Sequence, residues 1–454
     1  MLDLTPKKIM ERKALRINPC KTCQPVGAMY CALGVHRCLP HSHGSQGCCS
    51  YHRTFLTRHF KDPAPATTSS FTEGASVFGG GSNLKTAVRN VFDIYDPDVM
   101  AVHTTCLSET IGDDLHAYLT DIEIPEGKYV VYTHTPSYVG SHIYGFFNMM
   151  QGFIDCLGEK TGVCNGKAAI FPGFVNPGDM REMKRLAALM EVPFTMFPDT
   201  SGVMDAPMTG KYAMYPAGGT TIPEIKGLGD CKQVIALGQI TSAPAAEFLE
   251  KKFKVPYTVL PLPIGVEATD TYVMALSRFS KKEVPPELEE QRGQLIDILL
   301  DTHQYSHEKT VAIFGDPDTV QGLTALCLEM GMHPKYMITG TPKEEFTTRV
   351  TAMCDQYGIE NYKVKANADL FELHQWIKND PVDLLLGSSY GKQIAKAEDI
   401  PFVRAGFPVL DRYVHSYFPM VGYAGAMRFV EKITNAIMDR TDRDCKDEDL
   451  DVVM

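Results

Sequence analysis

The feature that most constrains this fold is the alternation of short apolar runs with helical stretches along most of the chain. Most of the apolar runs end in Gly, Pro, Asp, Ser or Thr. Runs bounded by turn residues and separated by helices are typical of parallel βαβ units. The expected strands are 99–102, 129–132, 168–171, 194–197, 233–237, 257–260, 310–314, 335–338, 362–365, 383–386 and 402–404.

The length of 454 residues suggests about three domains of this type, at roughly 150 residues each. We therefore expect an α/β protein with three Rossmann-like domains, whose mostly parallel open sheets are flanked by helices. The expected domains are 1–165, 166–290 and 291–404, with the C-terminal segment 405–454 joining the first one. Ligands of such sheets bind beyond the carboxyl ends of the strands.

Composition excludes several classes of protein. The net charge of −11, without a basic cluster, argues against binding of duplex nucleic acid. No transmembrane helix or secretion signal is expected, so we predict a cytoplasmic protein. In that compartment the 13 cysteines do not predict a disulfide framework. We interpret Cys31, Cys156, Cys327 and Cys354 as buried structural thiols.

Three other cysteines lie in segments of small and polar residues. Cys23 precedes Gln-Pro, Cys48 follows Gly-Ser-Gln-Gly, and Cys106 follows Thr-Thr. The backbone of such loops can approach an inorganic cluster closely, and its N–H groups can offset negative charge on sulfur. Ser137 ends a fourth segment of this kind. Because Cys106 and Ser137 each follow an expected strand, we expect one joint site.

Spacing alone leaves an iron–sulfur cluster, a zinc site and scattered structural thiols open. Structural zinc sites favour paired Cys-x2-Cys hooks. Cys20 and Cys23 have this spacing, but no second pair of the kind follows, and Cys48 and Cys49 are adjacent. The spacing therefore favours iron and sulfur without deciding between the three.

Longer motifs are more specific. The chain resembles the β chains of molybdenum-type nitrogenases in a series of motifs that follow in order along nearly its whole length. These motifs are Ile17–Pro19, Thr22–Ala28, His43–Cys48, Arg58–Phe60, Ala75–Gly80, Thr104–Cys106, Ile111–Asp114, His134–His142, Gly315–Asp318, Ser388–Lys392 and Gly406–Arg412. The resemblance implies an α2β2 protein that reduces dinitrogen to ammonia.

The resemblance also implies a P-cluster, an eight-iron seven-sulfur unit shared across the α–β interface. This chain would contribute Cys23, Cys48 and Cys106, with Cys48 bridging the two halves. Ser137 would bind iron reversibly on oxidation, because an alkoxide is a harder ligand than a thiolate; from its residues alone it would be a turn residue. Ser45 and Tyr51, beside the thiols, would support the site.

Two partners are implied as well. The iron protein would hydrolyse ATP and deliver electrons, which this chain would pass to the iron–molybdenum cofactor in the α chain. This sequence has no Gly-x4-Gly-Lys-Ser/Thr loop, so ATP would be bound by the partner. Phe78 would lie where the iron protein docks, whereas without the resemblance we interpret it as a core residue.

Four histidines near the cysteine loops are expected to be hydrogen-bonding loop residues rather than metal ligands. They are His43, His103, His134 and His142.

A cation site between two β chains is also implied. Asp297 and Asp301 are four residues apart on an expected helix, 287–303, and so share one face. From their residues alone they would be a solvated acidic face. The resemblance adds Asp62 and the backbone carbonyl of Lys61, a set of oxygen ligands that suits calcium or iron(II).

Alternatives remain within and outside this family. The β chain of a vanadium or iron-only nitrogenase is the nearest, followed by a nitrogenase-like cofactor scaffold and the dark-operative protochlorophyllide reductase. The combination of Cys23, Cys48, Cys106 and Ser137 argues against the last two, and Ser45 favours the molybdenum type. A purely structural subunit without a redox centre is a further alternative, against which the three thiols argue.

Overall fold

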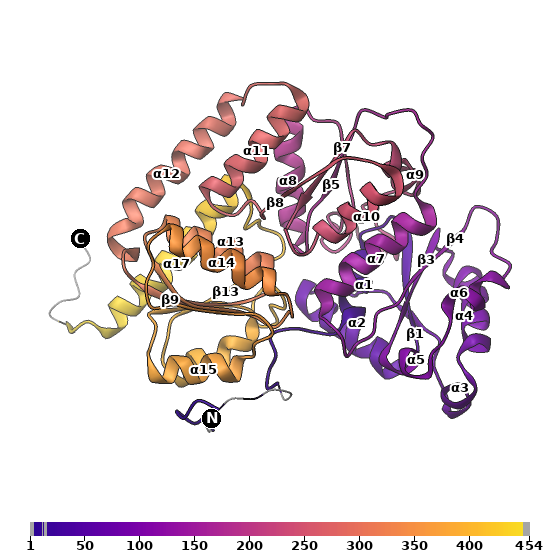
Figure 1. Cartoon of the computed structure of the whole chain (residues 1–454), viewed down its shortest axis with the longest axis horizontal. Coiled ribbons are helices and arrows are strands. Elements are labelled where there is room, and N and C mark those ends of the chain that lie inside the picture. Colours follow the sequence, from indigo (N-terminus) through magenta and orange to yellow (C-terminus); the bar gives the residue numbers. More distant parts are fainter. Residues whose placement is uncertain (1–3, 11, 13–15, 448–454) are drawn as a thin grey trace.

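The computed structural model describes residues 4–10, 12 and 16–447 of the chain. Its strands form three separate sheets, of four, five and four strands (Figure 1). Neighbouring strands run parallel in all three, as expected for βαβ units. The predicted α/β class with three parallel-sheet units is confirmed.

The first sheet has the order β2-β1-β3-β4. Its strands are β1 (Cys38–His43), β2 (Thr67–Thr68), β3 (Val99–Thr104) and β4 (Tyr129–Thr133). The helices of this part are α1 (Gln24–Leu33), α2 (Gln46–Phe60), α3 (Glu73–Phe78), α4 (Gly81–Tyr95), α5 (Cys106–Ile111), α6 (Leu115–Thr120) and α7 (His142–Leu157).

The second sheet has the order β6-β5-β7-β8, with β5 (Ala168–Phe171), β6 (Phe194–Met196), β7 (Gln233–Leu237) and β8 (Tyr257–Leu260). Its helices are α8 (Pro177–Leu189), α9 (Ile222–Lys226), the 3-10 helix η1 (Gly227–Asp230), α10 (Ala243–Phe253) and α11 (Val266–Ser280).

The third sheet has the order β11-β10-β9-β12-β13. Its strands are β9 (Thr310–Gly315), β10 (His333–Thr339), β11 (Lys363–Lys365), β12 (Leu384–Gly387) and β13 (Phe402–Arg404). The helices are α12 (Pro286–Ser306), α13 (Pro317–Glu329), α14 (Glu344–Gln356), α15 (Leu370–Asn379), η2 (Ser389–Gly391), α16 (Lys392–Ala397) and the C-terminal α17 (Gly422–Asp444).

All eleven strands expected from the sequence are present, with ends that differ by one or two residues. The sequence pattern missed β1 and β2. The missed strand β1 reads Cys-Leu-Pro-His-Ser-His, so it lacks the apolar run that identifies a buried strand. It is nevertheless buried at all six positions, because its polar side chains find hydrogen-bond partners inside the fold.

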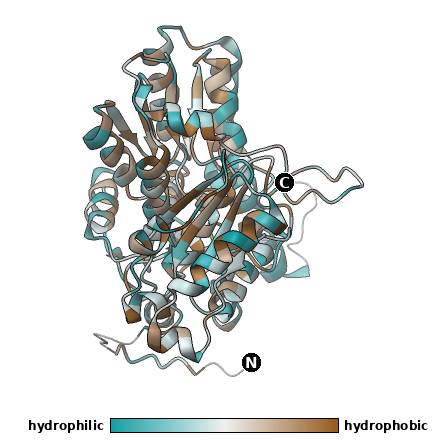
Figure 2. Ribbon diagram, turned by 90° about the vertical axis from the view of Figure 1, so that its right-hand side faces the viewer, coloured by the Kyte–Doolittle hydropathy of each residue, from teal (hydrophilic) through white to brown (hydrophobic). Residues whose placement is uncertain are grey.

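The strands form the apolar interior, and polar residues gather on the outer faces of the helices (Figure 2). One continuous cluster of buried apolar side chains includes Val99, Ile170 and Ile313, which belong to the three different sheets. The three parts therefore share a core. Among the described residues, no helix combines the length and the apolar character needed to cross a bilayer.

The C-terminal segment contacts more than one part of the molecule. The backbone N–H of Val409 donates to Nδ1 of His59 on α2 at 2.9 Å. Helix α17, further along, packs against α12, α11 and α8. The domain boundaries expected from the sequence stay a prediction.

Helices α1 and α7 pack unusually closely, and this contact places one end of the site. A Cβ atom at Gly145 of α7 would lie 1.8 Å from the carbonyl oxygen of Gln24, so only glycine fits there. The backbone N–H of His142 also donates to the carbonyl of Thr22 at 2.9 Å. Together these contacts hold Cys23, which lies between Thr22 and Gln24, beside the start of α7.

Candidate functional site

The site is built on the carboxyl edge of the first sheet. β1 and β3 are neighbours, and their last residues, His43 and Thr104, are paired. The pairing extends by one residue, because the N–H of Thr105 donates to the carbonyl of His43 at 3.0 Å. Since α2 and α5 begin directly beyond these strand ends, Cys48 and Cys106 emerge on the same edge.

The two loops touch at Gly44. Its φ of +145° is open to glycine, and a Cβ atom there would lie 1.9 Å from Oγ1 of Thr105. Cys23 comes from a third segment, as the N-cap residue of α1. Its sulfur lies 3.2 Å from Nε2 of His52, which is one helical turn after Cys48 on α2.

The thiols are close enough to influence one another. Burial raises the pKa of Cys23 to about 12, and the neighbouring sulfurs of Cys48 and Cys106 add to the rise. Burial also raises the pKa of Cys48, followed in size by the effect of Cys106. Negative charge on one sulfur thus disfavours charge on the next. Metal cations reverse this penalty, since thiolates are the form that binds metal.

This donor set fits an iron–sulfur cluster better than a single ion. Among the described residues, no group of three or more His, Cys, Asp or Glu side chains is arranged to hold one metal ion. Cys106 is exposed, and Cys23 and Cys48 are half-buried, so all three residues can reach a group shared with another chain. The buried Nδ1 of His52 has no hydrogen-bond partner among the described residues.

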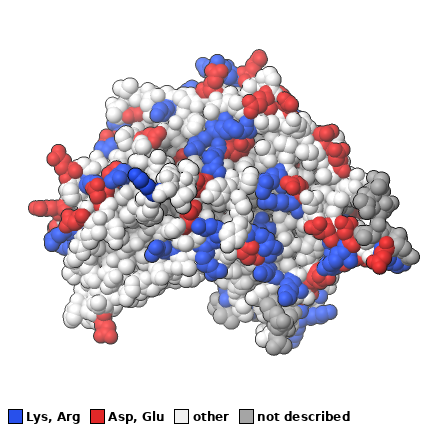
Figure 3. All heavy atoms as spheres, turned by 180° about the vertical axis from the view of Figure 1, so that it is seen from behind, with Lys and Arg blue, Asp and Glu red and all other residues white. Residues whose placement is uncertain are grey.

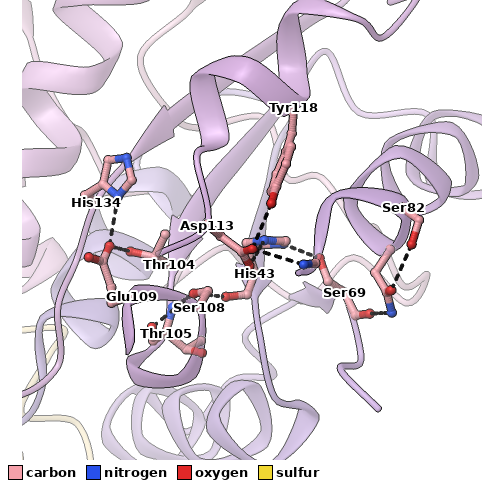
Figure 4. Close-up of polar contacts among 12 residues, drawn as sticks. His43, Ser69, Ser82, Thr104, Thr105, Ser108, Glu109, Asp113, Tyr118 and His134 are labelled. Atoms are coloured by element: carbon pink, nitrogen blue, oxygen red, sulfur yellow. Dashed lines mark hydrogen bonds and ion pairs between the residues drawn. The ribbon is translucent and has the colours of Figure 1, made fainter. Parts of the chain in front are cut away.

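The loop that carries Ser137 is tied to the Cys106 loop. Thr135 donates its backbone N–H to Oγ1 of Thr104 and its hydroxyl to the carbonyl of Thr104, both at 2.7 Å. Glu109 accepts from the Thr104 hydroxyl and contacts Nδ1 of His134 at 2.9 Å (Figure 4). Ser137 lies two residues beyond Thr135, half-buried in a turn, and its hydroxyl makes no hydrogen bond with a described residue.

Ser45 and Tyr51 flank the thiols on α2. Ser45 is the N-cap residue and accepts the N–H of Gly47 at 3.3 Å, so it fixes the turn that carries Cys48. The ring of Tyr51 is 51% exposed and packs against Phe55. Burial raises the pKa of Tyr51, and the thiol of Cys23 raises it further, which places this phenol near Cys23.

Phe78 is the last residue of α3, and its side chain is 90% exposed. The interpretation of Phe78 as a core residue is therefore wrong. Val77 beside it is 74% exposed, so two apolar side chains project from the end of this short helix. Exposed apolar groups at one point suit contact with another protein.

The residues expected to bind a cation between two chains lie apart within this one. Asp297 and Asp301 are both exposed on α12, whereas Asp62 and Lys61 follow α2, and these helices are well separated in Figure 1. Burial raises the pKa of Asp62. Lys61, in a left-handed conformation, donates its ammonium to the carbonyl of Leu410 at 3.0 Å. The cation site stays a prediction.

Sequence reasoning missed one buried polar group beneath the site. Nε2 of His43 and Oδ2 of Asp113 form a hydrogen bond at 3.0 Å, with both side chains buried. His43 and His103 lie on strands β1 and β3, and His142 is the first residue of α7, so the expectation that these three are loop residues is wrong. All three make hydrogen bonds. The only signal in the sequence was the pair of histidines at the alternate positions 41 and 43, which would share one face of a strand.

The structural thiols also differ from expectation at one position. Cys31, Cys327 and Cys354 are buried, as predicted. The prediction for Cys156 is wrong, because this residue is exposed in the last turn of α7. The prediction rested on the general tendency of free cysteines to be buried, but Cys156 follows Asp155 and is exposed at the helix end.

Long stretches of the segments that form the site carry no Asp, Glu, Lys or Arg, although Lys21 and Glu109 lie close by. Residues 38–52, 99–108 and 129–154 all lack these side chains. In Figure 3 the part of the surface formed by the first sheet and its helices, at the lower left, is largely free of charged side chains. A surface of this kind can be buried by a partner without leaving unpaired charges.

Comparisons with known proteins agree with this geometry. A family model described as nitrogenase component 1 type oxidoreductase matches residues 23–438. A nitrogenase molybdenum-iron protein beta chain from Clostridium pasteurianum is 60% identical, with 100% of both chains covered. Proteins with the same name from Nostoc sp. and Azotobacter vinelandii are 39% and 36% identical; each alignment covers 96% of this chain, and 86% and 87% of those proteins.

Two solved structures are also similar. The chain titled "Nitrogenase Cp1 at pH 6.5" has a TM-score of 0.99 and 60% identity, with 100% of both chains covered. A second chain, titled "Nitrogenase Cp1 at pH 5", has a TM-score of 0.71 at 14% identity and covers 97% of this chain and 92% of its own. At that identity the second likeness shows the fold alone.

Proposed function

Because this chain belongs to the nitrogenase component 1 type oxidoreductases, we propose that its part in the reaction is to relay electrons. It would act as the β subunit of a molybdenum nitrogenase, within a complex that reduces dinitrogen to ammonia. The observation that carries the proposal is the meeting of three thiols from three separate segments at one strand edge, on a surface with few charged side chains.

Cys23, Cys48 and Cys106 would hold this chain's half of an eight-iron seven-sulfur P-cluster. When bound, such a cluster accepts and passes on single electrons. The chain's own residues prepare the site: a neutral His52 can donate Nε2–H to the sulfur of Cys23, since burial lowers the pKa of this histidine to about 4. Ser137, whose loop is joined to the Cys106 loop through Thr135 and Thr104, would add an oxygen ligand.

The remaining half of the cluster would come from an α chain that covers this sparsely charged surface. That α chain would also hold the iron–molybdenum cofactor. The iron protein would dock at Phe78 and supply the ATP hydrolysis, for which this sequence has no phosphate-binding loop. The exposed Asp297 and Asp301 would meet Asp62 and Lys61 of a second β chain around calcium or iron(II).

The β chain of a vanadium or iron-only nitrogenase is the second candidate, because the thiol geometry alone does not select the distant metal. One experiment tests both. The complex is purified anaerobically with its native partners, and iron, inorganic sulfide and molybdenum are counted per tetramer. We expect all three. Vanadium or iron in place of molybdenum would favour the alternative, and a complex without inorganic sulfide would refute the relay.

A further inference from the structure

A buried hydrogen-bonded pair, His43 and Asp113, connects the exposed helix α3 to the loops that carry Cys48 and Cys106. Nε2 of His43 lies 3.0 Å from Oδ2 of Asp113, and both side chains are almost completely buried (Figure 4). A buried pair of this kind is weak evidence for stability, because desolvation opposes its attraction. Neither residue belongs to the proposed ligand set. Their contacts therefore call for another role.

One side of the pair reaches the proposed docking helix. Oδ1 of Asp113 accepts the backbone N–H of Gly80 at 3.0 Å, only two residues after Phe78. The hydroxyl of Tyr118 donates to the same oxygen at 3.0 Å. A shift at the end of α3 thus acts directly on this carboxylate.

The other side of the pair reaches the thiol loops. The carbonyl of His43 accepts the N–H of Thr105 at 3.0 Å and the hydroxyl of Ser108 at 2.8 Å, on either side of Cys106. The backbone N–H of Asp113 donates to the carbonyl of Ser108 at 3.0 Å. The pair therefore contacts α5 at its N-cap residue Thr105 and at Ser108, on both sides of Cys106, the first residue of the helix.

Asp113 carries a negative charge, and the ring of His43 is held in place by its contacts. Burial opposes ionisation of Asp113, but hydrogen bonds from His43, Gly80 and Tyr118 outweigh it and hold the pKa of Asp113 below its usual range. Nδ1 of His43 lies 2.8 Å from Oγ of Ser69. With both ring nitrogens engaged, the imidazole cannot rotate freely, so movement of the carboxylate moves His43.

We propose that Asp113 and His43 are positioning residues that transmit docking of the iron protein at Phe78 to the Cys106 loop. The inference rests on the proposed function, because it takes the end of α3 as the docking point. Docking would displace Gly80, and the displacement would pass through Asp113 to His43 and α5. The position of the Cys106 thiol would then depend on whether the partner is bound.

Amide hydrogen exchange in the assembled complex tests this, with and without saturating iron protein. In the wild type we expect docking to change exchange in two peptides, 71–84 and 99–110. In Asp113→Asn the change should persist in 71–84 and be lost from 99–110. Weakening one charge-assisted hydrogen bond should also speed exchange at the Gly80 amide about tenfold. The matched control is Asp114→Asn, since Asp114 only caps α6 through the N–H of Ala117 and should behave as wild type.

Two further measurements separate transmission from a purely structural role. Asp113→Asn should lower kcat and leave the apparent KM for the iron protein unchanged, whereas a misfolded surface would raise KM. Tyr118→Phe removes one hydrogen bond to the same carboxylate and leaves the hydrogen bonds of His43 unchanged. It should give a partial loss of the change in hydrogen exchange in peptide 99–110. This variant keeps the inference testable if Asp113→Asn folds poorly.

The outcomes are distinguishable. If peptide 99–110 of Asp113→Asn still responds fully to the iron protein, the transmission is refuted while the docking assignment stands. If peptide 71–84 of the wild type does not respond when the partner binds, the docking assignment itself fails, and the inference fails with it. Loss of the response in Asp114→Asn would also overturn the inference, because that residue lies outside the connected group.

Discussion

The packing of α1 on α7 allows a prediction that connects local sterics to the metal site. In Gly145→Ala the new Cβ would lie 1.8 Å from the carbonyl oxygen of Gln24, whereas real Cβ contacts almost never fall below 3.0 Å. The helices must therefore separate by more than about 1 Å. Overpacking of this kind costs about 1–3 kcal/mol. Because Gln24 follows Cys23 directly, the separation also moves that thiol.

A second glycine provides the matched control. Gly293 lies in the exposed interior of α12, and a Cβ there would have no neighbour within 4 Å. Gly293→Ala should therefore stabilise the protein by about 0.5–1 kcal/mol through helix propensity alone. The same propensity gain acts in Gly145→Ala and offsets part of its clash.

Calorimetry of the assembled complex at one scan rate, with iron counted per tetramer, measures both effects. We expect a lower unfolding temperature and reduced iron content for Gly145→Ala, and a slightly higher temperature with full iron for Gly293→Ala. If Gly145→Ala unfolds like the wild type and keeps all its iron, the close packing of α1 on α7 does not position Cys23. The reasoning from backbone contact to metal site would then be wrong.

Three other changes test separate parts of the structure. Cys106→Ala should lower iron and sulfide per tetramer, while the exposed Cys164→Ala should not; full iron and normal activity in Cys106→Ala would refute the ligand assignment. Ser137→Ala should keep the iron of the reduced complex and alter the spectrum of the oxidised one, and an unchanged oxidised spectrum would remove Ser137 from the site. Burial opposes ionisation of Asp411, but hydrogen bonds from Arg404 and from a serine hydroxyl lower its pKa to about 2. The ionised Asp411 therefore contributes about 1–2 kcal/mol to the free energy of unfolding, which is fully present above pH ~4 and lost as the pH falls towards 2. Denaturant unfolding across this range should show that Asp411→Asn is destabilised at the higher pH and equals the wild type at low pH.

Periodicity was sufficient for most of the fold. A strand such as β9 is apolar and ends at a glycine, so its pattern alone identifies a buried parallel strand. β1 lies at the centre of the first sheet and was missed, because burial of His41 and His43 depends on partners far away in the sequence. Local pattern carries no information about such partners.

The same limit applies to the site. Small-residue loops indicated Cys23, Cys48 and Cys106, but their meeting depends on the β1–β3 register and on the α1–α7 contact. Phe78 could not be placed from its own segment, because one aromatic followed by glycines fits a core as well as a surface. The partner of Asp113 is 70 residues away in the chain, so no motif could have revealed the hydrogen-bonded pair.

The electrostatics of the site fit the proposal that this chain binds a metal cluster together with a partner. Burial raises the pKa of Cys23 to about 12 and also raises the pKa of Cys48, so thiolates are disfavoured in the chain alone. The segments 38–52, 99–108 and 129–154 contain no Lys or Arg. In the proposed complex, iron would supply the positive charge that favours thiolates, and its binding would release protons, so loading would become less favourable as the pH falls. An α chain that covers this surface would exclude water from the electron path.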